Sequence, residues 1–273
     1  MDNVFCRTTV NYATGNPSGD LAPVEVAMHN GRIAMLPGWE GCGFQLVRHE
    51  SAVKDWSDDD AIARVHYAEL EALARELTGC DHATITSHIK RGPEYAALHE
   101  DLAPIEFVHS DFAAGYDDIL RQMMRDSANQ GDVQALLRNG LTAASIDDAR
   151  RIVVLQFWRN LGPARMDLPI GFCDARSVDG AEAQAFTIHD YAGAGGPSFE
   201  ALAIIPNDPD RHDWYAFPDL MPDEVIAFRT YDTARVATGE LYFTPHAAFR
   251  DPSVERGKPA RSSIELRATC LYS

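Results

Sequence analysis

The sequence has few of the features that mark membrane proteins or nucleic-acid-binding proteins. No run approaches the roughly 18 uninterrupted apolar residues that a membrane-spanning helix needs, so we expect no membrane partner. The 24 Lys and Arg residues are outnumbered by 41 Asp and Glu residues, which gives a net charge of −17. Such an excess of negative charge disfavours nucleic acid and anionic membrane surfaces as partners. It favours solubility instead.

Motifs for disulfides, zinc and nucleotides are also missing. The five cysteines are scattered and none has C-x-x-C spacing, which favours reduced thiols and a cytoplasmic location over a disulfide framework or a zinc knuckle. The opening "MDNVFCRTTVNY" has neither a basic segment nor an apolar core, so no secretory signal is expected. No G-x-G-x-x-G motif follows an apolar run and no P-loop is present, and "GAGG" at 193–196 reads as a loop.

The first half of the chain mixes short strands with helices. The "HNGR" segment at 29–32 predicts a hairpin turn. Residues 57–79 have apolar positions at helical spacing, with acids at the start and Gly79 at the end, so they predict a helix. "HATITSHIKR" predicts a strand that enters the core, and residues 114–139 and the "ASIDDARR" segment predict further helices.

From residue 152 onward the pattern is that of a β protein. Short apolar runs are separated by Gly, Pro and Asp turns at intervals typical of a sandwich or jelly roll rather than of alternating strands and helices. We therefore predict a mainly β, cupin-like jelly roll with flanking helices. It would occupy residues 1–273 as a single domain, with a homo-oligomer left open.

A histidine and an aspartate stand two residues apart at the end of one predicted strand. His109 and Asp111 lie in "IEFVHSDFAAG", and residues i and i+2 of a strand project from the same face. An imidazole and a carboxylate on one face supply two ligands of the facial site used by non-haem iron oxygenases. A hydrogen-bonded surface pair is the alternative for this motif.

The third ligand of such a site must come from a distant strand. The two downstream candidates are His246 and His212. His246 is followed by Arg261 and Ser263, an arginine and a hydroxyl on one strand face, which is the combination that suits the far carboxylate of 2-oxoglutarate. His212 has no such pair after it, which favours His246. His212 then stays open as a residue near the metal, a substrate contact or a surface histidine.

Four residues on two predicted strands are candidates for substrate binding. Trp158 and Arg159 alternate in "QFWRNLG", so only one of them can face the interior. Arg159 suits either an anionic substrate or a structural ion pair, and we favour the ion pair. His212 and Trp214 in "HDWYAF" suit either a substrate platform or a core aromatic patch.

Several segments in order along the chain resemble a known family, the fungal and bacterial hydroxylase/desaturases. This family includes the cephalosporin 7α-methoxylation component, the gibberellin desaturase and the aspergillic-acid hydroxylase. The similar segments include "TTVNY", "GCGFQLVRHESAVKDW", "FVHSDF", "LQFWRNLGPARMDLPIGFCDARSV", "HDWYAFPDLMPDEVIAFRTYD", "TPHAAFRDP" and "RSSIELRA". Two departures are visible: "QFWRNL" stands where the family often has N-x-W-R-P, and the chain is short for the family, so substrate-covering loops are expected to be reduced.

The resemblance implies a double-stranded β-helix that uses Fe(II), 2-oxoglutarate and dioxygen. It implies His109, Asp111 and His246 as iron ligands, with Arg261 and Ser263 binding 2-oxoglutarate. No catalytic residue beyond this metal centre is expected. The expected reaction is hydroxylation or desaturation of a small secondary metabolite, and the sequence does not choose between the two. The alternatives are a non-catalytic or differently metallated cupin-like binding protein and a cupin-type hydrolase or isomerase.

Overall fold

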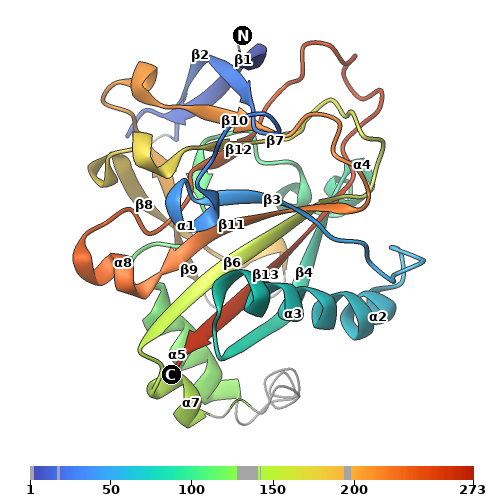
Figure 1. Ribbon diagram of the computed structural model, residues 1–273. Helices are drawn as coiled ribbons and strands as arrows, with labels where there is room; N and C mark the ends of the chain where they lie inside the picture. The colour runs from blue at the N-terminus through green and yellow to red at the C-terminus, as the bar shows by residue number, and fades with distance from the viewer. Residues whose placement is uncertain (1–2, 17–18, 128–140, 142, 194–197) are drawn as a thin grey trace.

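The computed structural model describes residues 3–16, 19–127, 141, 143–193 and 198–273, and two antiparallel-rich sheets dominate this part of the chain (Figure 1). One sheet has eight strands in the order β1-β2-β10-β7-β12-β5-β9-β8 and the other has five in the order β3-β11-β6-β13-β4. The strands are β1 (Val4–Ala13), β2 (Leu21–Asn30), β3 (Phe44–Arg48), β4 (His82–Arg91), β5 (His109–Ser110), β6 (Arg151–Asn160), β7 (Ile170–Cys173), β8 (Ala183–Ile188), β9 (Phe199–Ile204), β10 (Trp214–Ala216), β11 (Glu224–Asp232), β12 (His246–Ala248) and β13 (Ser263–Tyr272). The predicted jelly roll with flanking helices is confirmed.

Helices are few and mostly short. The α-helices are α1 (Gly38–Gly41), α2 (Asp59–Ala61), α3 (Tyr67–Thr78), α4 (Pro93–Ala96), α5 (Tyr116–Ser127), α7 (Ala143–Asp147) and α8 (Thr233–Thr238). Single turns of 3-10 helix lie at Glu100–Leu102, Ala175–Ser177, Gly180–Glu182, Tyr191–Gly193 and Pro209–Arg211. Among the described residues, no helix has both the length and the apolar character needed to cross a membrane.

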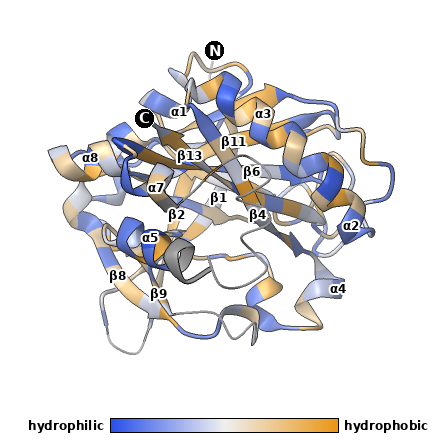
Figure 2. Ribbon diagram, turned by 90° about the horizontal axis from the view of Figure 1, so that it is seen from below, coloured by the Kyte–Doolittle hydropathy of each residue, from blue (hydrophilic) through white to orange (hydrophobic). Residues whose placement is uncertain are grey.

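The helix predicted for residues 57–79 is present and packs on the five-stranded sheet. The Asp58 side chain accepts a hydrogen bond from the Ala61 amide at 2.9 Å and so caps α2. A π-helical turn, Ile62–His66, joins α2 to α3, and Gly79 ends α3 at a φ of 67°. In Figure 2, α3 carries both hydrophobic and hydrophilic residues, as expected for a helix with one buried face.

The central strands β6 and β13 divide their side chains between two layers. On β13, Ile264 and Leu266 belong to the apolar core shared with α3. The intervening residues Ser263 and Glu265 therefore face the space between the two sheets. Because β13 pairs with β6 over its whole length, this polar row is held in a fixed register beside the interior face of β6.

The hairpin prediction at 29–32 is wrong. The hairpin is formed by β1 and β2, and its connection lies at residues 14–20. Asn30 ends β2 instead, and the next amide, that of Gly31, donates to the Ala216 carbonyl at 2.8 Å. The segment after Asn30 does not return as an antiparallel partner of β2, because the second neighbour of β2 is the distant strand β10, which runs parallel to it.

Other local predictions are confirmed only in part. The strand predicted at "HATITSHIKR" is β4. The helix predicted for residues 114–139 is present as α5, while residues 128–139 lie outside the described residues. The helix predicted around "ASIDDARR" ends at Asp147, because β6 begins at Arg151. Of the predicted "GAGG" loop, only the first glycine is described, at the end of a 3-10 turn.

Candidate metal centre

Three side chains from β5, the residue after it and β12 meet in one cluster. His109 and His246 are directly paired residues on neighbouring strands, and Asp111 follows β5 on the face of His109. One ligand atom from each of the three residues lies within 4.8 Å of the others. The imidazole centroids of His109 and His246 are 4.3 Å apart. The backbone pairing therefore places two nitrogens and one carboxylate oxygen around a single point.

Both imidazoles are anchored through the same ring nitrogen. His109 Nδ1 donates to the Phe107 carbonyl at 2.8 Å, and His246 Nδ1 donates to the Thr244 carbonyl at 2.9 Å. A carbonyl oxygen only accepts, so each ring carries its proton on Nδ1 and keeps the Nε2 lone pair free. This arrangement of anchored Nδ1 and free Nε2 is the usual one for histidines that bind a metal.

The charges of the cluster also suit a divalent cation. Burial lowers the pKa of His109 to about 3, and burial is also the main cause that lowers the pKa of His246, so both rings are neutral at pH 7. Burial alone would raise the pKa of Asp111, but Arg267, His246 and His109 outweigh it and hold that pKa at about 2. Asp111 Oδ2 is buried and has no hydrogen-bond partner within the described part of the chain. A bound cation would satisfy this oxygen, so the residues present fit Fe(II).

Arg261 provides a buried guanidinium that lines the same cavity as the cluster. Its Nε donates to Ser263 Oγ at 3.0 Å, and the guanidinium lies 5.0 Å from the centroid of the Trp158 ring. No carboxylate forms an ion pair with Arg261 among the residues that the structure describes, and burial lowers its pKa to about 9. The Glu265 and Asp167 carboxylates favour the charged form of Arg261 without pairing directly with its guanidinium. A buried guanidinium without a direct partner is costly, so it fits the far carboxylate of 2-oxoglutarate.

Two further arginines hold the carboxylates around the cluster. Arg267 Nη2 lies 3.3 Å from Asp111 Oδ1 and 3.8 Å from Glu265 Oε1. Arg91 donates to Glu265 Oε1 at 2.9 Å and also to Tyr191 Oη and to the carbonyls of Asp101 and Ala103. The sequence places Arg267 and Glu265 on the face of Arg261 but does not show that Arg267 reaches Asp111. Arg91 ends a strand without any distinguishing motif, so sequence reasoning misses it.

The contact between Arg267 and Asp111 makes iron affinity sensitive to residue 267. In Arg267→Met, Asp111 loses the cation that orients its carboxylate, so we expect iron affinity to fall about 10- to 100-fold. Titration of the apoprotein with Fe(II) under anaerobic conditions measures the effect. Arg267→Lys keeps the charge and should recover part of the affinity. Equal iron affinity in the wild type and the Met variant would contradict this role.

None of the four predicted substrate residues lines the cavity of the cluster, and only Trp158 contacts a residue that does, because the Arg261 guanidinium lies over its ring. Arg159 follows Trp158 on β6 and lies on the opposite face, where it donates to the Pro222 carbonyl and contacts His49. Its guanidinium also lies 5.7 Å from the centroid of the Trp56 ring. Arg159 lies on this face because successive residues of a strand point to opposite sides of the sheet. Its partners are a carbonyl, a histidine and a tryptophan ring, so the ion pair with an acid that we favoured from the sequence does not form among the described residues.

His212 and Trp214 lie in a buried hydrogen-bonded chain away from the cluster. The Tyr12 hydroxyl is 2.7 Å from His212 Nδ1, and His212 Nε2 is 2.9 Å from Glu182 Oε2. Trp214 Nε1 donates to the Tyr12 hydroxyl at 3.0 Å. Both ring nitrogens of His212 are therefore occupied, which removes it as an alternative metal ligand. Neither His212 nor Trp214 lines the cavity of the metal cluster.

This chain of hydrogen bonds predicts a stability effect without an effect on iron. Tyr12→Phe removes the hydroxyl and leaves the buried nitrogens of His212 and Trp214 without their partner. We expect the free energy of unfolding to fall by about 1–3 kcal/mol, measured by urea denaturation. Iron affinity should stay unchanged because Tyr12 does not touch the cluster. A loss of iron affinity at unchanged stability would instead tie these residues to the metal.

The chain is similar to one protein family and to several known proteins. The model of one protein family, described as oxidoreductase/YMDC permease-like domain, matches residues 6–271. The chain belongs to this family. A hydroxylase/desaturase efuI from Hormonema carpetanum is 29% identical over 251 residues, which cover 84% of this chain and 77% of that protein. An alpha-ketoglutarate-dependent dioxygenase phiK from a fungal species is 25% identical and covers 94% and 87% of the two chains.

A third relative and a solved structure agree with these two. The gibberellin cluster GA4 desaturase of Gibberella fujikuroi is 26% identical, with 85% of this chain and 82% of that protein covered. The structure of the iron and alpha-ketoglutarate-dependent endoperoxidase NvfI superimposes with a TM-score of 0.73 at 19% identity, over 99% of each chain. The resemblance to Fe(II)/2-oxoglutarate-dependent hydroxylases and desaturases predicted from the sequence is confirmed by the relatives, and the structural match confirms the fold.

Proposed function

We propose that this protein is an Fe(II)- and 2-oxoglutarate-dependent oxygenase that hydroxylates or desaturates a small organic metabolite. The relatives are enzymes of this class, and they support both cofactors. The observation that carries the proposal is the combination in one cavity of two anchored imidazoles, one buried carboxylate and a buried arginine that forms no ion pair with any residue the structure describes. A binding protein without catalysis has no need for all of these groups together.

His109, Asp111 and His246 would hold the iron, and Arg261 with Ser263 would hold 2-oxoglutarate. When bound, this centre supplies the oxidising power that breaks a C–H bond as 2-oxoglutarate and dioxygen are consumed to give succinate and carbon dioxide. The protein orients these groups and excludes water. The Phe107 and Thr244 carbonyls fix the two rings, and Arg267 and Glu265 fix the surrounding charges.

The remaining predictions about partners and location stay proposals. A small-molecule substrate is supported by the relatives, whereas Arg159, His212 and Trp214 are left out of the proposed substrate site because their contacts lie elsewhere. The net charge of −17 supports the absence of a nucleic-acid or membrane partner, and five free cysteines support a cytoplasmic location. We also propose one domain over residues 1–273, with a homo-oligomer left open, and the family match over residues 6–271 supports the single domain.

Succinate formation tests the proposed function directly. The purified protein with Fe(II), 2-oxoglutarate and dioxygen should release succinate, because these enzymes turn over 2-oxoglutarate slowly even without their substrate. A panel of small apolar metabolites should raise the rate for at least one compound, and mass spectrometry of that compound then separates a gain of oxygen from a loss of two hydrogens. No succinate under any of these conditions would overturn the proposal.

A further inference from the structure

A buried aspartate, Asp167, holds the backbone of the arginine that would bind 2-oxoglutarate. Asp167 is 5% exposed, and its Oδ1 accepts a hydrogen bond from the Arg261 amide at 3.0 Å. Its Oδ2 accepts a second hydrogen bond from the Gly257 amide at 2.8 Å. Both carboxylate oxygens therefore hold the segment 257–261, which leads into β13. Nothing proposed above for iron or 2-oxoglutarate gives this carboxylate a role.

Asp167 itself is fixed to the sheet that carries the metal cluster. Phe172 of β7 lies directly opposite His246 of β12. The backbone pairing extends beyond the start of β7, where the Asp251 amide donates to the Asp167 carbonyl at 3.1 Å. Arg261, in contrast, stands just before β13 in the five-stranded sheet. The Asp167 carboxylate therefore joins the segment that carries Arg261 to the sheet that carries His246.

The guanidinium of Arg261 lies beside the same segment. Its Nη1 is 3.5 Å from the Leu168 carbonyl oxygen, and the guanidinium lies 5.0 Å from the centroid of the Trp158 ring. Burial lowers the pKa of Arg261 to about 9, and the charge of Asp167 counters part of this effect. Asp167 thus acts on the position of Arg261 through the backbone and on its charge through the electric field.

The position of Arg261 matters because the proposed cofactor is held at both ends. In the proposed site, 2-oxoglutarate would reach from the metal ligands of the eight-stranded sheet to Arg261 beside the five-stranded sheet. The guanidinium must then lie at the distance that the length of the cofactor sets. Binding groups of this kind work only when neighbouring hydrogen bonds hold them within about 0.5 Å of the required position.

We propose that Asp167 is a positioning residue for 2-oxoglutarate, which holds the Arg261 backbone so that the guanidinium meets the far carboxylate of the cofactor. The inference rests on the proposed function and adds to that site the residue that joins its two sheets. Because Asp167 acts through Arg261, a 2-oxo acid that lacks the far carboxylate should bind equally well with and without Asp167.

Two ligands of equal chain length test this dependence. 2-Oxopentanoate has the five carbons of 2-oxoglutarate but no far carboxylate. In Asp167→Ala, we expect 2-oxoglutarate to bind about 3- to 10-fold more weakly, the effect of losing one hydrogen bond, while 2-oxopentanoate and Fe(II) bind as in the wild type. Calorimetry on the iron-loaded protein without dioxygen measures these affinities. In an Arg261→Met background, Asp167→Ala should cause no further loss.

The ring of Trp158 gives a second measurement that needs no ligand. In the ¹⁵N-labelled full chain, each of the four tryptophans gives one indole N–H resonance, and Trp158→Phe assigns the one of interest. Asp167→Ala should move this resonance, because the Arg261 guanidinium shifts relative to the ring.

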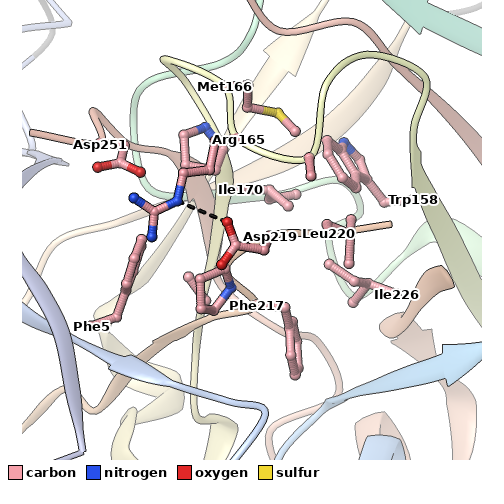
Figure 3. Close-up of a pocket in the computed structure, with 14 residues that line it drawn as sticks. Phe5, Trp158, Arg165, Met166, Ile170, Phe217, Asp219, Leu220, Ile226 and Asp251 are labelled. Atoms are coloured by element: carbon pink, nitrogen blue, oxygen red, sulfur yellow. Dashed lines mark hydrogen bonds and ion pairs between the residues drawn. The ribbon is translucent and has the colours of Figure 1, made fainter. Parts of the chain in front are cut away.

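Asp251→Ala is the matched control. Asp251 is also buried, and its Oδ1 accepts from the amide and the hydroxyl of Ser253 at 2.8 and 2.6 Å. Figure 3 shows Asp251 and Trp158 on opposite sides of the small pocket that both residues line. Asp251→Ala should lower the free energy of unfolding but change neither the Trp158 resonance nor the affinity for 2-oxoglutarate.

Three outcomes in Asp167→Ala would overturn the inference. They are an unchanged affinity for 2-oxoglutarate, an equal loss for 2-oxoglutarate and 2-oxopentanoate, and an unmoved Trp158 resonance. If Asp167→Ala does not fold, Asp167→Asn replaces it under the same criteria, because Asn keeps the size of the side chain but loses the charge and one acceptor. None of these measurements needs turnover. A protein that binds 2-oxoglutarate with this dependence on Asp167 but forms no succinate would therefore refute the proposed function alone.

Discussion

His246→Ala is expected to lose both iron binding and succinate formation while the protein stays folded. The side chain provides one of three ligand atoms that lie within 4.8 Å of one another. Loss of a group that only orients a ligand costs about 10- to 100-fold in metal affinity, so loss of the ligand itself should cost more than 100-fold. Metal analysis after anaerobic loading measures binding, and circular dichroism checks the fold.

His109→Ala and Asp111→Ala should also lose iron binding and succinate formation, because each variant keeps only two of the three proposed ligands. His189→Ala is the matched control, because His189 is exposed and contacts Ser198 rather than the cluster. It should keep full iron content. Full iron affinity in His246→Ala would show that the metal lies elsewhere, whatever the activity of that variant.

The positions of these three residues were accessible from the sequence because strand periodicity is a local rule. A spacing of two places His109 and Asp111 on one face, and the same rule places Arg261, Ser263 and Glu265 together. The fold class followed from the turn spacing after residue 152 and is confirmed. His246 needed a further argument, the Arg-x-Ser pattern downstream, and the structure then placed it directly opposite His109.

What the sequence could not provide depends on contacts between distant segments. The contact of Arg267 with Asp111 spans two different sheets, and no local pattern records which carboxylate a buried arginine meets. His212 was ambiguous for the same reason, because its partners Tyr12 and Glu182 come from remote parts of the chain. The face of Arg159 was also undecided, since alternation shows only that it opposes Trp158. The packing of Trp158 in the apolar cluster between the sheets resolves it.

Arg261→Met is expected to raise the concentration of 2-oxoglutarate needed for half-maximal succinate formation by about 10- to 150-fold. The guanidinium is buried and has Ser263 on one side and the Trp158 ring on the other. A hydrogen bond to a charged group contributes about 1.5–3 kcal/mol, which corresponds to this factor. Met fills a similar volume and avoids a large cavity, so the protein should fold. The three proposed iron ligands are untouched, and iron content should therefore stay normal.

Arg261→Lys separates charge from geometry. An ammonium keeps the positive charge but loses the planar pair of donors that matches a carboxylate, and it also loses Nε, which bonds Ser263. Its requirement for 2-oxoglutarate should lie between those of the wild type and the Met variant. Ser263→Ala should have a smaller effect than either, because it removes one hydrogen bond to Arg261 and no charge.

An unchanged 2-oxoglutarate requirement in Arg261→Met, with normal iron content, would show that another cation holds the cofactor. Arg91 would then be the first residue to test, because it lines the same cavity, although its donors are bonded to Glu265, Tyr191 and two carbonyls.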